Sequence, residues 1–373
     1  MKRTLQFPLI LRITFMLLFI WLSFFILTEF RNYLAPLTLG VLFAYLLFPL
    51  ANFLEKHGFA RILANLLAII IGLSIIYGIG FFMYKQFGLF IEDWPILKER
   101  ATDNINNMIT SVAHYMGDDS GNLKREAKQL IGSILNSPTW DIKSAFGPTA
   151  FTLFTVLIMP VYVFFLLFYR NKFKEFILML VPQGKHAVAN RIIDEINTIT
   201  VRYMTGMFIV VTILAVLNVS GFYIIGLEHA LLLGIVAAIM NFIPYYGTII
   251  GYLFPVFMAI FIMDSPIFVF LVILQFIIVQ FTENNILTPN IVGAHVNLNP
   301  FMIILSITFG GFLWGLPGMI IAVPFAAMVR VLGENIEELK PIGFLLGQTG
   351  VDEHSITREK IRNFFSFSSK KKS

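Results

Sequence analysis

Long apolar stretches separated by short polar ones dominate the chain. Five of them hold about twenty mainly apolar residues, the length that an α-helix needs to cross a bilayer. They are residues 9–28, 34–54, 62–84, 149–169 and 205–226. This pattern predicts an all-α, polytopic integral membrane protein. Lys2 and Arg3 precede the first stretch, but no small-residue cleavage site follows it, so we expect an uncleaved anchor.

Lysine and arginine are sorted between alternate connections of these stretches. If the N-terminus is cytoplasmic, the connections 55–61 and 170–204 both lie inside and are rich in basic residues, whereas Arg31 is the only basic residue in a short outer loop. Cytoplasmic loops of membrane proteins carry an excess of Lys and Arg. We therefore expect both termini, including the basic tail 341–373, in the cytoplasm.

Residues 85–147 are polar and rich in both signs of charge. Two stretches within them keep the apolar spacing of a helix, one from Ile105 and one from Ala127, and the turn-forming sequence GDDSGN at 117–122 separates the two. We predict a small extracytoplasmic helical insert. Its apolar stripes pack within the chain, on the membrane surface or on a neighbouring subunit, which leaves a homo-oligomer open.

Two further apolar segments, 230–263 and 300–332, contain helix breakers. As one straight helix each would measure about 50 Å, against a hydrocarbon core of about 30 Å. Each follows an ordinary apolar segment, 205–226 and 266–282. This repeat of a span and a broken segment predicts two re-entrant hairpins in an inverted-repeat arrangement. Two kinked full spans are the alternative, and they leave the C-terminus on the same side.

Glycine and proline in these segments indicate backbone without intrahelical partners. Such backbone occurs at membrane depth only where protein or a water-filled cavity satisfies it. We predict that the breakers line a transport pathway, and ordinary kinking with close helix packing at glycine is the competing interpretation. The expected breakers are Pro244, Gly247, Gly251, Pro255, Gly311, Gly315, Pro317, Gly318 and Pro324.

Few ionisable residues fall within the apolar segments, where each costs about 2.5–3.5 kcal/mol on insertion scales. Glu283 ends an apolar run and is followed by Asn284 and Asn285. One carboxylate beside several amides suits a cation, a proton or a polyhydroxylated solute, and a helix-end cluster at the interface is the alternative. Three more polar side chains lie inside an apolar segment, where they need partners in the pathway or on a neighbouring helix. These are Asn241, Tyr245 and Tyr246.

Composition and charge exclude several classes of function. Of the 373 residues, 57% are hydrophobic and 13% are charged, and the mean hydropathy is +0.80, whereas soluble domains are about 25% charged. The net charge of +5 is sorted by membrane side and not gathered into one patch, which argues against nucleic acid as a partner. Cysteine is absent, and no phosphate-binding loop or metalloprotease spacing occurs. We therefore expect no enzyme, no cofactor and no metal site.

Some stretches resemble a known family. The chain contains GLEHALLLGIVAAIMNFIPYYGTIIGYLFP, TENNILTPNIVGAHVNLNP and GGFLWGLPGMIIAVP. These resemble three signature regions of the autoinducer-2 exporter family of bacterial permeases. The resemblance implies a secondary transporter of the bacterial inner membrane, whose members export the autoinducer-2 quorum-sensing signal or exchange sodium for protons. The chain departs from the family pattern at Thr248, where proline is usual, and at Met207, where glutamine is common.

Three functions follow from these patterns. The leading prediction is a permease that exports a small polar organic solute. The alternative is a sodium/proton antiporter with Glu283 as the carrier, and a non-transporting membrane scaffold is the third. A scaffold has no need of irregular backbone in the bilayer, which argues against it. The expected organisation is a three-span region (1–84), the insert (85–147), a transport core (148–340) and the tail (341–373).

Overall fold

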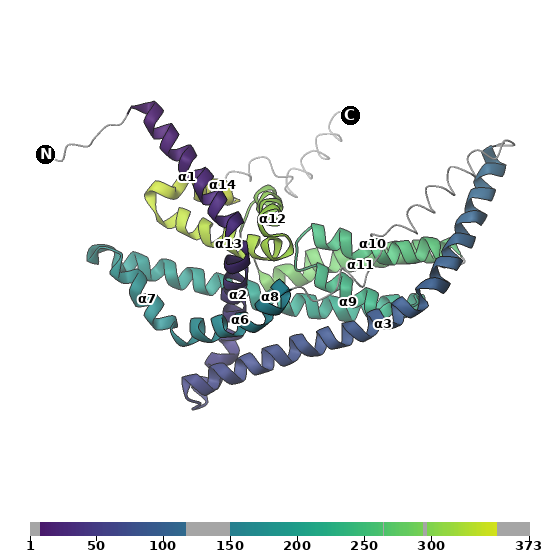
Figure 1. The fold of residues 1–373 in the computed structure, drawn as a ribbon, viewed down its shortest axis with the longest axis horizontal. Coiled ribbons are helices and arrows are strands. Elements are labelled where there is room, and N and C mark those ends of the chain that lie inside the picture. The colour runs from purple at the N-terminus through teal and green to yellow at the C-terminus, as the bar shows by residue number, and fades with distance from the viewer. Residues whose placement is uncertain (1–7, 117–149, 264, 294–296, 349–373) are drawn as a thin grey trace, which may run out of the picture.

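The structure is a computed structural model that describes residues 8–116, 150–263, 265–293 and 297–348 (Figure 1). Within these ranges the regular secondary structure is helical, apart from one isolated antiparallel bridge between Leu298 and Gly347. The helices up to the third apolar stretch are α1 (Leu9–Glu29), α2 (Arg31–Lys56) and α3 (Arg61–Met116). The next are α6 (Ala150–Phe168), α7 (Arg170–Met179), the 3-10 turn η2 (Gln183–Lys185) and α8 (His186–Ile225).

The C-terminal half contains two pairs of shorter helices. The first pair is α9 (Ala230–Met240) and α10 (Tyr246–Phe261), followed by α11 (Pro266–Thr282) and the π-helix η3 (Glu283–Val292). The second pair is α12 (Pro300–Trp314) and α13 (Leu316–Asn335), followed by the 3-10 turn η4 (Glu337–Leu339) and α14 (Lys340–Leu346). All the predicted apolar stretches are helical, which confirms the all-α prediction.

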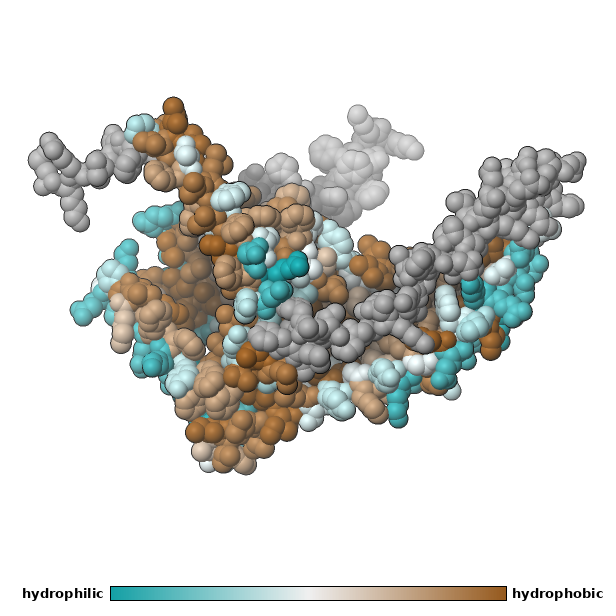
Figure 2. All heavy atoms as spheres, in the orientation of Figure 1, coloured by the Kyte–Doolittle hydropathy of each residue, from teal (hydrophilic) through white to brown (hydrophobic). Residues whose placement is uncertain are grey.

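The helices present their apolar side chains outward. Among the described residues, six helical segments are long and apolar enough to cross a bilayer: α1, α2, Arg61–Asn107, Gln183–Ile225, Pro266–Val292 and α13. Large apolar side chains such as Phe19, Ile70 and Ile224 are exposed on them. Figure 2 shows such residues over α1 and over the α2, α3 and α6 side of the molecule. An exposed apolar surface of this extent is unfavourable in water, and six helical segments are long enough to cross a bilayer. The protein is therefore a multi-pass membrane protein.

Helix α3 is longer than the sequence pattern predicts. It runs unbroken through the 62–84 stretch and the first part of the predicted insert, because Pro95 alone does not end it. Phe90 and Leu97 are buried in a core that α3 shares with α8, α9, α10 and α11, and Asn104 donates from Nδ2 to the carbonyl of Phe261 at 3.3 Å. The described part of the insert therefore packs within its own chain. The second predicted stretch, from Ala127, lies outside the described residues.

The two predicted broken segments are helix–turn–helix hairpins. The first turns at residues 241–245 and the second at Gly315, whose φ of +66° and ψ of −140° suit only glycine. Helices α12 and α13 cross where Gly310 and Gly318 meet backbone to backbone. Five of the nine expected breakers lie within helices and do not end them: Gly251 and Pro255 in α10, Gly311 in α12, and Gly318 and Pro324 in α13. Both of these prolines are buried.

Three apolar cores hold these elements together. The largest joins α2, α8, η3, α12 and α13 around Val210, Ile307 and Val331. A second joins α3, α8, α9, α10 and α11 around Phe222 and Met258. The third joins α2, α3 and α6. Helix α8 has 40 residues and contributes to the first two cores. The first hairpin and the α11–η3 segment therefore pack against the same helix.

Candidate functional site

The turn between α9 and α10 has a strained backbone. Tyr245 has φ +65° and ψ −57°, and the amide of Tyr246 donates to the carbonyl of Pro244 at 2.8 Å. A hydrogen bond between residues two apart across such a positive-φ residue defines a γ-turn of the rarer, strained form. A Cβ atom at Gly247 would overlap the carbonyl of Met240. Backbone strain of this kind concentrates at functional sites.

The same turn places Asn241 beside Glu283. Asn241 is 3% exposed, its Nδ2 donates to Oε1 of Glu283 at 2.7 Å, and its Oδ1 accepts from the Thr248 hydroxyl at 2.9 Å. The Gln280 side chain also hydrogen-bonds to the Glu283 carboxylate. A carboxylate is thus held inside an apolar segment by neutral amides, and no cationic side chain in the described part of the chain pairs with it. We name Asn241, Thr248, Gln280 and Glu283 the carboxylate cluster.

Glu283 also lies at a change of helix type. The ordinary helix α11 ends at Thr282, and η3 begins at Glu283 as a wider π-helix of ten residues. π-Helical turns are rare and are frequent at functional sites. At Gly206, α8 approaches η3 closely, because a Cβ there would lie 3.1 Å from the carbonyl oxygen of Ile291. The carboxylate therefore stands at the start of an irregular segment packed on α8.

The other predicted polar residues lie elsewhere. Asn284 and Asn285 are exposed, and Asn285 donates from Nδ2 to the carbonyl of Phe281, four residues earlier, at 2.9 Å. Tyr245 is exposed. The Tyr246 hydroxyl forms a hydrogen bond of 3.0 Å with the Thr308 hydroxyl, which links α10 to α12. The structure thus brings Asn241 and Glu283 together, and it does not bring Asn284 and Asn285 to them.

A second polar group lies between α8, α10 and α11. The Tyr252 hydroxyl donates to Oδ1 of Asn218, and Nε2 of Gln275 donates to the carbonyl of Asn218 at 3.2 Å. All three residues are buried. Oε1 of Gln275 has no hydrogen-bond partner among the described residues. We name Asn218, Tyr252 and Gln275 the amide cluster.

The two clusters share helix faces. Thr248 and Tyr252 are four residues apart on α10, and Gln275 and Glu283 are eight apart along α11 and into η3, so each pair lies on about one helix face. Sequence reasoning missed Thr248 as a partner and the whole amide cluster. The sequence does contain a signal for them, because polar side chains recur four residues apart (Thr248 and Tyr252) and eight residues apart (Gln275 and Glu283) within apolar runs.

The breakers serve packing as well as turns. Gly251 packs on the backbone of Ala237, and Gly311 packs on the side chain of Met319. Pro317 lies in the first turn of α13, where proline is well tolerated. The second hairpin has no ionisable side chain in its described turn, and its Trp314 indole donates to the carbonyl of Leu27 in α1 at 2.8 Å. The polar chemistry therefore gathers at the first hairpin.

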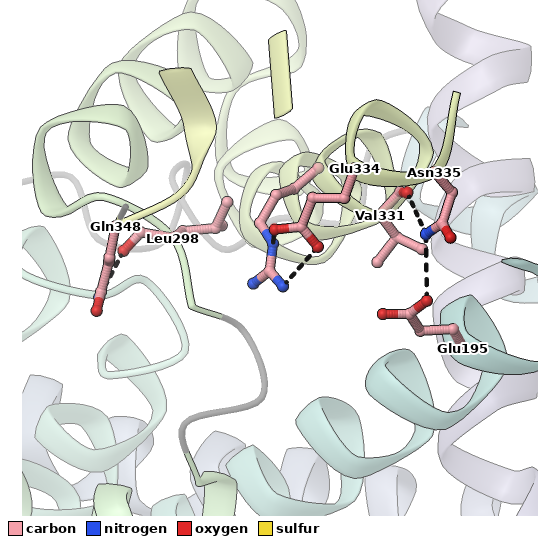
Figure 3. A network of polar contacts seen from close by, with 7 residues as sticks. Glu195, Leu298, Val331, Glu334, Asn335 and Gln348 are labelled. Carbon is pink, nitrogen blue, oxygen red and sulfur yellow. Dashed lines mark hydrogen bonds and ion pairs between the residues drawn. The ribbon is translucent and has the colours of Figure 1, made fainter. Parts of the chain in front are cut away.

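A charged network joins the end of α13 to α8 (Figure 3). Arg330 is buried and donates to both carboxylate oxygens of Glu334, at 2.9 and 3.1 Å. Asn335 donates from Nδ2 to Glu195 at 3.3 Å and to the carbonyl of Val331 at 3.0 Å. Oδ1 of Asn335 also accepts from Arg191 of α8 at 2.9 Å. Sequence reasoning did not select Arg330.

Comparison with known proteins places this architecture in a family. A model described as AI-2E family transporter matches residues 10–338. "Putative transport protein YrrI" of Bacillus subtilis (strain 168) is 27% identical over 324 residues, which are 85% of this chain and 90% of the relative. "Putative permease PerM" of Escherichia coli (strain K12) is 25% identical over 319 residues, 83% of this chain and 89% of the relative. A "Putative transport protein" of Thermotoga maritima is 26% identical over 332 residues, 88% and 95% of the two chains. The chain therefore belongs to the AI-2E transporter family of membrane permeases.

Proposed function

We propose that the protein exports a small polar organic solute across the bacterial inner membrane, along a pathway between the α9–α10 hairpin and the start of η3. The observation that carries the proposal is the carboxylate cluster, in which Glu283 is held by Asn241 inside an apolar segment. Ionisable groups in such segments are expensive and mark substrate or ion pathways. No covalent step is needed, so we propose a permease and not an enzyme.

The chemistry of the cluster fits a solute with hydroxyl groups. Asn241 and Gln280 offer amide donors and acceptors, Thr248 offers a hydroxyl, and Glu283 accepts strongly when ionised. A polyhydroxylated solute can replace these mutual hydrogen bonds one for one. The autoinducer-2 signal, to which the family owes its name, is the candidate that we propose to test first.

Sodium/proton exchange is the alternative, with Glu283 as the carrier. It is supported by the same carboxylate, which can bind a proton or contribute an oxygen ligand to sodium. A non-transporting scaffold has no comparable support, because a scaffold has no use for a half-buried carboxylate beside a strained turn.

Flux across the membrane of proteoliposomes distinguishes these functions. The purified chain is reconstituted into lipid vesicles. One set of vesicles is loaded with autoinducer-2, and efflux of the solute is measured. A second set is loaded with a pH-sensitive dye, and proton movement driven by a sodium gradient is measured. Efflux of the solute supports the proposal, and sodium-dependent dye response without solute efflux supports the antiporter. Neither flux, from protein shown to be folded, favours the scaffold.

A further inference from the structure

A cavity lies apart from both polar clusters, between α2, α6, α7 and the first half of α8. Its volume is about 450 Å³, which is within the range of small organic ligand sites, about 300–1,000 Å³. Most of its wall is apolar and comes from helices of the membrane region. The apolar wall includes Val41, Ala44, Leu166, Leu167, Ile196 and Val201.

The cavity opens along α7. Phe173 and Ile177 of α7 line it, and yet they are 47% and 44% exposed. Phe176 and Leu180, three and seven residues after Phe173, are also exposed, so α7 has one apolar face that the protein leaves uncovered. Such a helix lies in the membrane interface with its apolar face toward the acyl chains. The opening therefore faces lipid.

Both signs of charge stand at this opening. Lys174 and Asp194 line the cavity, form an ion pair of 2.8 Å, and have side chains that are 37% and 63% exposed. Arg170 also lines it and is held by Glu55 through two hydrogen bonds, at 3.0 and 2.6 Å. Arg61 also approaches Glu55, at 3.8 Å, so the groups around the opening carry one net positive charge. The Asp194 carboxylate beside Lys174 nevertheless opposes a head group that carries only negative charge. A head group with one charge of each sign meets both Lys174 and Asp194.

We propose that this cavity binds one phospholipid with a zwitterionic, primary-amine head group, of the phosphatidylethanolamine type. An acyl chain lies along the wall formed by α2, α6 and α8, the phosphate pairs with Lys174, and the ammonium pairs with Asp194. The basic residues Arg170, Lys172 and Lys174 place this end of α7 at the cytoplasmic interface by the positive-inside rule, so the lipid comes from the inner leaflet. The bound lipid then joins α7 to the spans behind it.

Lipid retention tests the proposal. The full chain is placed in nanodiscs of equal parts phosphatidylethanolamine, phosphatidylglycerol and phosphatidylcholine with identical chains, transferred to detergent, and examined by native mass spectrometry. We expect one phosphatidylethanolamine per chain. Asp194→Asn should remove the preference over phosphatidylcholine, whose quaternary ammonium cannot donate a hydrogen bond, and Lys174→Gln should lower retention of all three lipids severalfold.

Two filling variants test the location. Ala44→Phe and Val41→Phe, at a buried and a half-buried position of one wall, should each abolish retention. Lys340→Gln, which breaks the exposed Lys340–Glu337 pair outside the cavity, is the matched control and should retain the lipid. Equal retention of the three lipids, a preference for phosphatidylglycerol, or retention that survives a folded filling variant would overturn the proposal. If neither filling variant folds, the two exposed charge variants decide.

Discussion

At the scale of single residues, Asn241 connects the strained turn to the carboxylate. Its two amide atoms are both engaged, Nδ2 with Glu283 and Oδ1 with Thr248, which fixes the orientation of the amide. A solute or an ion that binds Glu283 therefore competes with Asn241. If the turn that carries Asn241 moves, Glu283 loses its hydrogen bond from Asn241. A change in the strained γ-turn at Tyr245 would therefore alter how Glu283 binds a solute or an ion.

Replacing Glu283 by Gln should lower flux in proteoliposomes about tenfold, the effect of weakening one charged hydrogen bond by about 1.4 kcal/mol. Thermal unfolding should change little, because the Gln oxygen still accepts from Asn241. Glu337→Gln, at a side chain that is 89% exposed, is the control and should leave flux unchanged. Wild-type flux with an unaltered pH dependence in Glu283→Gln would contradict this role.

Replacing Tyr252 by Phe should destabilise the protein by about 1–3 kcal/mol, because it leaves Oδ1 of Asn218 buried without its donor. The measurement is thermal unfolding in a fixed lipid–detergent mixture. The control is Tyr223→Phe, which removes the hydroxyl of an exposed tyrosine on α8, the helix that also carries Asn218. A midpoint for Tyr252→Phe equal to that of Tyr223→Phe would show that the amide cluster contributes nothing to stability.

At the scale of elements, the sequence predicts the breaks but not how each breaker acts. Gly315 ends α12, as expected for glycine at a turn, whereas Pro324 lies buried inside α13. Proline removes one helical hydrogen bond, and a packed neighbour can outweigh that loss. The continuous helix α3 and the π-helix η3 depend on tertiary packing, which the apolar pattern does not contain.

Replacing Gly318 by Ala should disrupt the second hairpin, because the added Cβ would overlap the carbonyl of Gly310. Overpacking against backbone costs about 1–3 kcal/mol or more. Gly78→Ala in α3, where a Cβ meets no atom within 4 Å, is the matched control and should gain about 1 kcal/mol from helix propensity. Yield of monodisperse protein and its unfolding midpoint measure both effects. Equal midpoints would mean that the Gly310–Gly318 crossing is not tight.

At the scale of the whole molecule, the polar clusters draw on α8, the first hairpin and the α11–η3 segment. Asn218, Asn241 and Glu283 are far apart in sequence and meet only after these elements pack together. Glu283 and Asn241 could be selected from sequence because each interrupts an apolar run. Their pairing, and the place of Gln275 beside Asn218, depend on the register of three helices, which a single sequence does not give.

The lengths of the hairpin helices bear on how the whole chain crosses the membrane. Helices α9, α10 and α12 have 11, 16 and 15 residues, which is shorter than the roughly 20 that a crossing needs. The 20 residues of α13 reach that length, but its last turns belong to the charged network around Arg330 and Asn335. These lengths support two re-entrant hairpins over two kinked spans.

Re-entrant hairpins predict the side of each connection. With the N-terminus in the cytoplasm, Ser265 lies outside and Ala294, which is outside the described residues, lies inside, whereas kinked full spans exchange the two. The chain has no cysteine, so Ser265→Cys and Ala294→Cys can be labelled separately by a membrane-impermeant thiol reagent in bacterial cells whose outer membrane is permeabilised. Labelling after lysis is the control for reactivity. We expect labelling of intact cells at position 265 alone. Labelling at position 294 alone would convert both hairpins into spans, and the carboxylate cluster would then lie beside a kink and not at the tip of a hairpin that dips into the membrane from outside.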